Sequence, residues 1–273
     1  MKIALNGANG FVGTKLRQAF DNHVVLERND TQEEMLKKLQ DVDVVINLAG
    51  APIIKKWTKE YKKTLYSSRI VTTKNLVNAI NQSSVKYFIS TSAVGIYPNN
   101  VPCNESCDTY PKDFLSTLAQ SWESEAKNAN VPTAILRFGI VLGSDGGALK
   151  QMLTPFKLGV GGIIGDGKMK MSWIDISDLI NIYQFLMDKR LIGTFNASSP
   201  NPVTNYEFTK TLGKVLHRPT MLPLPEFVLK LVFGEASSVL TDSKEVYPKE
   251  LENAGFKFSY PTLQESLEHL LDF

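Results

Sequence analysis

The fold is decided by one short stretch, Asn6-Gly7-Ala8-Asn9-Gly10-Phe11-Val12-Gly13, which follows the apolar run Ile3-Ala4-Leu5 and opens a helical pattern. Glycine at Gly7 permits a tight turn, Gly10 lets backbone N–H groups approach a pyrophosphate, and Gly13 lets the helix pack closely on the strand. The helix N-terminus adds a dipole that favours an anion. The stretch therefore predicts a strand, a turn and a helix that together hold a dinucleotide. The expected contacts are Gly7, Asn9, Gly10, Phe11, Val12 and Gly13.

Outward from this stretch, short apolar runs alternate with segments of helical periodicity. Strands are expected at 2–5, 23–26, 42–47, 86–90 and 133–138. Helices are expected at 11–20, 31–39, 68–81 and 113–129. This alternation is typical of βαβ units, so the first half predicts an α/β fold with a doubly wound parallel sheet.

The second half has a looser pattern. Glycine-rich loops occupy 143–147 and 159–167, and such loops usually line a site or a hinge. Prolines after residue 200 divide the rest into short helices, expected at 205–216, 226–233 and 263–271. We therefore expect a nucleotide-binding domain over 1–200, with substrate-loop insertions at 143–167, and a smaller, mostly helical C-terminal domain over 201–273.

Composition excludes several classes of protein. The chain has 30 Lys and Arg against 28 Asp and Glu, which gives no broad basic field for a nucleic acid. No uninterrupted apolar run approaches the roughly 18 residues of a membrane-spanning helix. The N-terminus runs directly into the first strand and leaves no room for a secretory signal. We expect a cytoplasmic protein without nucleic-acid or membrane partners.

No metal site is expected either. Cys103 and Cys107 have no second pair and no nearby histidine, so they are interpreted as ordinary thiols. Asp175 and Asp178 are too few to hold a metal ion, and Asp178 is expected to cap the helix that follows it.

Several motifs together resemble the short-chain dehydrogenase/reductase superfamily in its extended form. The glycines are spaced Gly-x-x-Gly-x-x-Gly, and four further segments match. They are Ile46-Asn-Leu-Ala-Gly50, Ser90-Thr-Ser-Ala-Val-Gly-Ile-Tyr97, Arg137-Phe-Gly-Ile-Val-Leu-Gly143 and Met171-Ser-Trp-Ile-Asp-Ile-Ser-Asp178. With Pro202-Val-Thr-Asn205 and His217-Arg-Pro219, the chain resembles an atypical, epimerase-like family of unassigned substrate with its own C-terminal domain of unknown function. The resemblance covers essentially the whole chain and implies a Rossmann fold and an NAD(P) cofactor.

The residues after the second strand bear on the choice of cofactor. The resemblance places Leu48, Ala49 and Gly50 beside the adenine and ribose. Arg28 falls where a basic residue accepts the extra phosphate of NADP, so NADP is favoured. Glu27 precedes Arg28 and keeps NAD as an alternative. Both side chains could equally be solvated charges at the end of a strand.

The usual proton-transfer residues of the superfamily are missing. Its tyrosine position is occupied by Leu118, its lysine position by Trp122 and its asparagine position by Arg69, while its serine is retained as Ser92. Leucine cannot carry a proton, and tryptophan cannot lower the pKa of a phenol electrostatically. The standard mechanism therefore cannot be transferred to this sequence.

A rebuilt site is one hypothesis. Ser92, Tyr97 and Arg69 are the candidate catalytic residues; Arg69 would supply the positive charge of the missing lysine, and Trp122 would pack near the nicotinamide ribose. Tyr97 also fits a loop tyrosine that covers apolar surface, Trp122 also fits core packing, and Ser92 also fits a strand-end hydroxyl that caps a backbone group. These alternatives stay open at this point.

Two functions follow. The first is an NAD(P)-dependent oxidoreductase or epimerase acting on a small polar or nucleotide-linked molecule, and the second is a sensor or scaffold that binds NADP(H) without turnover. Lysines 55, 56, 59, 62 and 63 would attract a phosphate-bearing substrate or form a solvated face. The resemblance also implies a homodimer through the helices at 68–81 and 113–129.

Overall fold

The computed structural model describes residues 1–271 and contains a six-stranded parallel sheet in the order β10-β6-β4-β3-β1-β2. Its strands are β1 (Ile3–Asn6), β2 (His23–Leu26), β3 (Val44–Asn47), β4 (Tyr87–Ala93), β6 (Thr133–Phe138) and β10 (Gly193–Ala197). Strand β1 pairs with β2 on one side and β3 on the other, so the chain reverses its direction across the sheet between β1 and β3. Ligands of doubly wound sheets bind outside the carboxyl ends of the strands at such a point. The expected fold class is confirmed.

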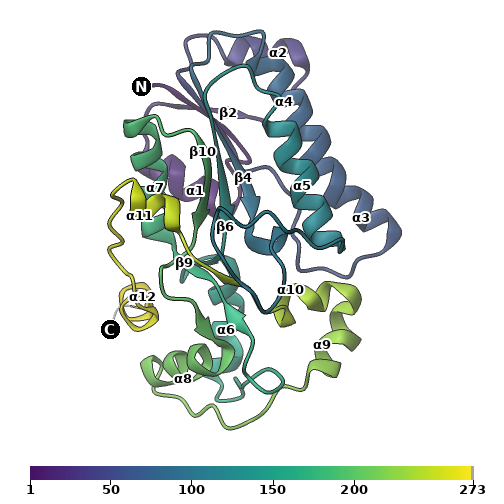
Figure 1. Cartoon of the computed structure of the whole chain (residues 1–273), viewed down its shortest axis with the longest axis vertical. Helices are drawn as coiled ribbons and strands as arrows, with labels where there is room; N and C mark the ends of the chain where they lie inside the picture. Colours follow the sequence, from purple (N-terminus) through teal and green to yellow (C-terminus); the bar gives the residue numbers. More distant parts are fainter. Residues whose placement is uncertain (272–273) are drawn as a thin grey trace.

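Helices cover both faces of the sheet (Figure 1). One face carries α1 (Phe11–Ala19) and α7 (Ile176–Lys189), and the other carries α2 (Gln32–Lys38), α4 (Thr72–Ile80) and α5 (Phe114–Ala126). Side chains alternate along each strand: Ile3 and Leu5 enter the first core cluster, whereas Ala4 enters the second. The sheet is therefore buried on both sides, as its nearly continuous apolar strands require.

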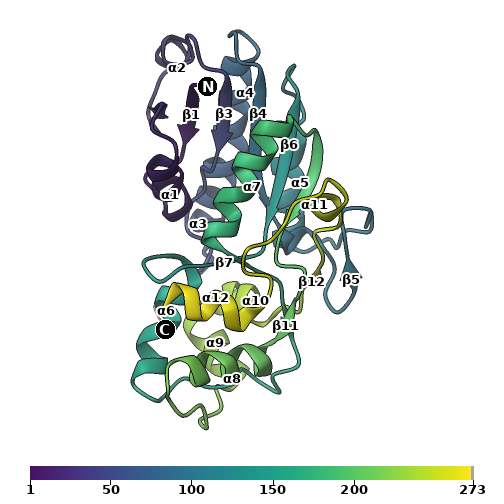
Figure 2. The same cartoon turned by 90° about the vertical axis from the view of Figure 1, so that its left-hand side faces the viewer.

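The remaining elements gather mostly below the carboxyl ends of the strands (Figure 2). The helices are α6 (Gly147–Lys157), α8 (Asn205–Val215), α9 (Glu226–Phe233), α10 (Ser238–Thr241), α11 (Lys249–Asn253) and α12 (Leu263–Leu270). The small strand pairs are β5 (Pro102–Cys103) with β12 (Glu245–Val246), β7 (Ile140–Leu142) with β9 (Trp173–Asp175), and β8 (Lys170–Met171) with β11 (Val203–Thr204). Phe208 and Leu267 share one core cluster with Ile3, so packing continues across residue 200.

The helix expected at 68–81 begins earlier in the structure. Helix α3 (Lys59–Tyr66) leads through a π-helical turn, Ser67–Val71, into α4. The side chain of Thr58 caps α3 by accepting a hydrogen bond from the N–H of Tyr61. Lysines 59, 62 and 63 therefore lie on a helix, and the wider π turn carries Arg69.

The expected role of Asp178 is wrong. Asp175 is the N-cap of α7, where its side chain accepts a hydrogen bond of 2.7 Å from the N–H of Ser177. Asp178 lies inside the first turn and accepts the N–H groups of Ser259 and Tyr260, at 2.8 and 3.0 Å. Its carboxylate thus attaches the segment before α12 to α7.

Close packing explains several glycines of the two glycine-rich loops. A Cβ atom on Gly146 would lie 2.1 Å from the ring of Phe11, and one on Gly162 would lie 1.5 Å from the carbonyl oxygen of Leu222. The first loop therefore lies directly against α1, where Lys15 and Asp145 also form an ion pair of 2.6 Å. The second lies against the segment that leads into α9.

Gly162→Ala is expected to lower the free energy of unfolding by about 1–3 kcal/mol, because the new methyl group would overlap main-chain atoms that cannot rotate away. Gly95→Ala is the matched control, since its Cβ would meet the side chain of Leu115 at an ordinary 3.6 Å. Urea denaturation measures both changes. Equal stabilities for the two variants would contradict the packing described for Gly162.

Candidate functional site

The turn after β1 needs glycine at two positions. Gly7 has a φ of +86°, and a Cβ atom there would lie 2.8 Å from the carbonyl carbon of Leu48. A Cβ atom on Gly13 would lie 2.4 Å from the carbonyl oxygen of Gly7. The turn is therefore pressed against both the loop after β3 and the start of α1. Larger residues at either position would separate these segments.

Gly10 differs from its two neighbours in the motif. A Cβ atom there would come no closer than 3.4 Å to a heavy atom, the carbonyl oxygen of Gly7. Gly10 is also the N-cap of α1, and no side chain caps that helix. The first-turn N–H groups are thus left without a side-chain acceptor at an open backbone surface, which fits a pyrophosphate group.

Three other residues of the motif lie around this turn. Phe11 and Val12 are partly buried, and the ring of Phe11 lies among the glycines of the 143–147 loop. Asn9 is exposed and accepts a hydrogen bond of 3.3 Å from Arg17. The structure thus brings the predicted motif residues together at one end of α1.

The end of β2 carries Arg28 on the surface. Leu26 at the end of β2 is aligned with Asn6 at the end of β1. Arg28 therefore follows β2 at the same edge of the sheet as the glycine turn. Asp30, the nearest following acid, is occupied by Lys38 at 2.6 Å and by the N–H of Glu27 at 2.7 Å. Within residues 1–271 no ion pair joins Arg28 to a carboxylate, and the strand before it is a neighbour of β1.

Buried amides fix the loop after β3. Asn6 donates to Asn47 at 3.0 Å, and Asn47 donates to the hydroxyl of Thr73 at 2.8 Å and accepts the N–H of Ala49 at 3.3 Å. Trp122 donates its indole N–H to the same Thr73 hydroxyl at 2.9 Å. The predicted contacts Leu48, Ala49 and Gly50 therefore follow a rigid strand end.

Arg69 contacts the main chain directly after this loop. Its Nη2 donates to the carbonyl of Ala51 at 2.9 Å, and its Nη1 donates to the carbonyl of Leu65 at 3.4 Å. The guanidinium carbon lies 5.4 Å from the centre of the Trp122 ring. Burial lowers the pKa of Arg69 below its ordinary value. Arg69 and Trp122, two of the predicted site residues, thus contact each other next to Gly50.

Ser92 and Tyr97 belong to a different group of side chains. The hydroxyl of Ser92 donates to Glu123 at 2.7 Å, and Glu123 accepts two hydrogen bonds from Arg137, at 2.7 and 2.8 Å. Arg137 also donates to the hydroxyl of Tyr97 at 2.7 Å, and this hydroxyl donates to Asn196 at 2.9 Å. We call these five residues the Glu123–Arg137 network.

The network is closed to solvent. Ser92 is 1% exposed and Tyr97 is 0% exposed. Burial raises the pKa of the Tyr97 phenol well above its usual range. The sequence interpretation missed Glu123, although one signal was present: it is the single acid among the apolar residues that form the buried face of α5.

Leu118 and Trp122, which align by sequence with the tyrosine and lysine positions of the superfamily, are packed among apolar side chains. Leu118 and Trp122 form one cluster with Trp57 from the loop after β3 and with Ala236 from the C-terminal segment. Lys62 on α3 reinforces this contact through an ion pair of 2.5 Å with Glu235. The C-terminal segment therefore covers the side of α5 that carries Leu118 and Trp122.

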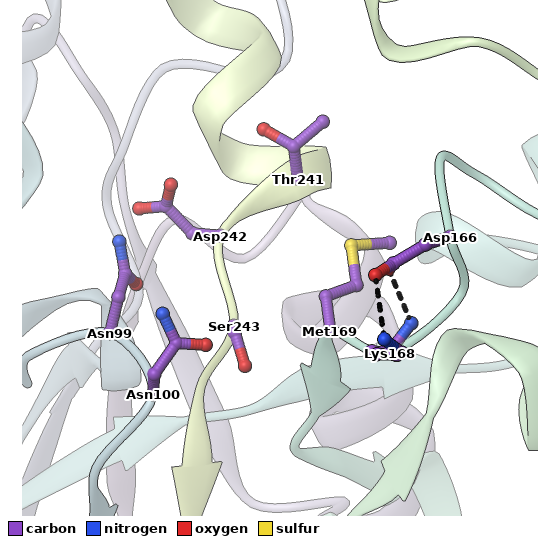
Figure 3. Close-up of a pocket in the computed structure, with 8 residues that line it drawn as sticks. All are labelled: Asn99, Asn100, Asp166, Lys168, Met169, Thr241, Asp242 and Ser243. Carbon is purple, nitrogen blue, oxygen red and sulfur yellow. Dashed lines mark hydrogen bonds and ion pairs between the residues drawn. The ribbon is translucent and has the colours of Figure 1, made fainter.

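A polar cavity of about 360 Å³ opens between the β4–β5 connection, the α6–β8 connection and the end of α10 (Figure 3). Its lining residues are Asn99, Asn100, Asp166, Lys168, Met169, Thr241, Asp242 and Ser243. Figure 3 shows Asn99 and Asn100 on the side of Asp242, with Asp166 and Lys168 opposite. Burial raises the pKa of Asp242. The sequence interpretation singled out none of these cavity residues except within the glycine-rich loop.

Residues 1–271 offer neither a metal site nor a membrane-spanning helix. No group of three or more histidine, cysteine, aspartate or glutamate side chains is arranged to hold a metal ion. No helix in this part of the chain has the length and apolar character needed to cross a bilayer.

Comparison with known proteins gives relatives over the full length of the chain. An epimerase family protein of Staphylococcus haemolyticus is 35% identical over 99% of this chain and 99% of its own length. A protein of Arabidopsis thaliana named as a chloroplastic homologue of epimerase family protein SDR39U1 is 34% identical over 99% of this chain and 87% of its own length.

Solved structures agree with this relationship. Human epimerase family protein SDR39U1, crystallised with NADPH, superposes with a TM-score of 0.93 at 30% identity, over 100% of this chain and 99% of that one. A dTDP-4-dehydrorhamnose reductase from Bacillus anthracis superposes with a TM-score of 0.83 at 19% identity, over 100% of this chain and 99% of that one, which shows a shared fold alone.

Family models cover both parts of the chain. Residues 224–270 match a domain of unknown function, DUF1731, and residues 3–198 match the model of the NAD dependent epimerase/dehydratase family. The second match spans most of the chain and agrees with the glycine turn and the doubly wound sheet. The chain therefore belongs to the NAD dependent epimerase/dehydratase family.

Proposed function

We propose that the chain binds NADP(H) along the carboxyl edge of its sheet and acts as an oxidoreductase on a small polar substrate. The observation that carries this proposal is the turn at Gly7, Gly10 and Gly13, where two glycines are required by packing and the third is exposed and would have one ordinary contact if it carried a Cβ. The NADPH in the crystals of human SDR39U1 supports the same choice of cofactor. When bound, the cofactor supplies or accepts a hydride at its nicotinamide.

Different residues of this chain would each bind a different part of the cofactor. The glycine turn, with Asn9, Phe11 and Val12, would hold the pyrophosphate, and Leu48, Ala49 and Gly50 would border the adenine ribose. Arg28 would bind the 2′-phosphate of NADP as an exposed cation at the end of β2. Trp122, 5% exposed, would act as a packing surface for Arg69.

Arg28→Ala is expected to weaken NADPH binding by about tenfold or more, because a charge-assisted hydrogen bond contributes about 1.5–3 kcal/mol. NADH lacks the 2′-phosphate, so its affinity should not change. Parallel fluorescence titrations with the two dinucleotides measure this. A variant that loses affinity for both equally would contradict the assignment of Arg28.

The chemistry proposed is hydride transfer without a protein acid at the usual tyrosine position. Ser92 and Tyr97 are assigned to the Glu123–Arg137 network, because both hydroxyls are buried and hydrogen-bonded. Epimerisation needs a base for a substrate hydroxyl, and Leu118 and Trp122 cannot act as one. Reduction of an acceptor that takes its proton from water is therefore favoured over epimerisation.

A second candidate is a sensor or scaffold that binds NADP(H) without turnover. Apolar packing at Leu118 and Trp122 favours it, because this packing closes the position of the usual catalytic pair. The assay that separates the two is NADPH oxidation with a panel of carbonyl compounds and sugar nucleotides. Stereospecific hydride transfer to one of them supports the oxidoreductase; binding of NADPH without oxidation across the panel supports the sensor. A cytoplasmic location and a homodimer through α4 and α5 are kept as predictions.

A further inference from the structure

Arg69 carries a charge that the chain itself does not neutralise. Its two hydrogen-bond acceptors, the carbonyl oxygens of Ala51 and Leu65, are uncharged. Within residues 1–271, no ion pair joins Arg69 to a carboxylate. A guanidinium has five N–H donors, so several of them are left for another acceptor.

Arg137 provides the comparison. It is also withdrawn from water, and Glu123 holds it through two hydrogen bonds and an ion pair. Withdrawing a charge from solvent is costly unless an opposite charge accompanies it. The chain supplies that partner for Arg137 and supplies none for Arg69, which is partly buried. An acceptor from outside the chain would complete the environment of Arg69.

The position of Arg69 indicates which part of the molecule an added acceptor would lie next to. A Cβ atom on Gly50 would lie 3.0 Å from the guanidinium carbon, so the charge lies against the main chain just after β3. The same loop contacts Gly7 through Leu48. The π turn that carries Arg69 is a type of distortion that often occurs at functional sites. Arg69 is therefore close to the edge proposed for the cofactor.

The charges around this loop favour an anion. Lys55 and Lys56 follow Gly50 on the same segment, and both are exposed. Helix α3 carries further charged residues. Its Lys62 is already paired with Glu235 of the C-terminal segment. Glu60 lies in the first turn of α3 and is exposed. The segment that follows Gly50 therefore carries two exposed cations.

We propose that Arg69 binds a carboxylate or phosphate group of the substrate, and that this contact selects an anionic substrate. The inference rests on the proposed function, since it places the substrate next to NADP(H). A planar guanidinium suits this role, because it binds both groups through two parallel hydrogen bonds. The guanidinium carbon lies 5.4 Å from the centre of the Trp122 ring, a cation–π contact that restricts where the group can move.

The test uses the full chain saturated with NADPH and titrates inorganic phosphate at constant ionic strength, with the melting temperature as readout. Phosphate should raise the melting temperature of the wild type. Arg69→Gln should weaken the apparent phosphate affinity at least about tenfold, which corresponds to about 1.4 kcal/mol. Arg69→Lys keeps the charge but loses the two parallel N–H donors of the guanidinium, so it should weaken the phosphate affinity less. The matched control is Arg218→Gln, an exposed arginine that also donates to a main-chain carbonyl.

The NADPH affinity of Arg69→Gln identifies the source of the anion. An unchanged affinity supports a substrate group, whereas a tenfold loss means that Arg69 binds a phosphate of the cofactor and overturns the proposal. Equal phosphate responses in wild type and Arg69→Gln also overturn it. If the wild type fails to bind NADPH yet phosphate still acts through Arg69, the anion site stands and the proposed function falls.

Discussion

Glu123→Ala is expected to destabilise the protein by about 3–5 kcal/mol, because it leaves the guanidinium of Arg137 buried without its counter-charge. Both side chains of this pair are 4% exposed. Arg137 would retain only neutral partners, the hydroxyls of Tyr97 and Tyr110. Ser92 would lose its acceptor at the same time. The free energy of unfolding in urea measures the loss.

The control replaces both partners by apolar residues of similar size, as Glu123→Leu with Arg137→Met. Such replacements of buried ion pairs are often neutral or stabilising, so the double variant should recover much of the stability. A loss below about 1 kcal/mol for Glu123→Ala would contradict the description of a closed network. It would mean that water reaches Arg137 and, with it, Ser92 and Tyr97.

Gly10→Ala is expected to weaken NADPH binding while the fold survives. The added methyl group would meet only the carbonyl oxygen of Gly7, at an ordinary 3.4 Å, so stability should change by less than about 1 kcal/mol. The same methyl group would occupy the surface where a pyrophosphate approaches the backbone, and affinity should fall at least about tenfold. Fluorescence titration and urea unfolding on one preparation measure both quantities.

Gly13→Ala provides the opposite result from the same motif. Its Cβ would lie 2.4 Å from the carbonyl oxygen of Gly7, so α1 could not keep its position, and a destabilisation of about 1–3 kcal/mol is expected. If Gly10→Ala and Gly13→Ala lose stability equally, the motif is a packing device, and the assignment of Gly10 to a ligand is wrong.

Much of the fold follows from the sequence because its first half has regular patterns. Strand β2 and strand β6 have the expected bounds, and α9 does as well. The sequence pattern does not predict β10, where Gly193-Thr194-Phe195-Asn196-Ala197 has few apolar residues, because pairing with β6 stabilises this strand. Tertiary contacts likewise decide that Asp178 reaches the segment before α12.

The candidate site is predictable in part. The glycine turn is a local motif, so its residues and geometry can be inferred from spacing. The roles of Ser92 and Tyr97 depend on Glu123, Arg137 and Asn196, which are distant in sequence and come together only through the sheet and α5. Arg69 could be singled out because it replaces an expected asparagine. Its missing counter-charge could be recognised only in three dimensions.

We propose above that the glycine turn of this chain binds NADP(H). The most direct measurement is the fluorescence of NADPH titrated with wild-type protein and with Gly10→Ala. Enhanced, blue-shifted emission that saturates is expected for the wild type, and an affinity at least about tenfold weaker is expected for the variant. No response from the wild type, or identical curves for the two proteins, would contradict it.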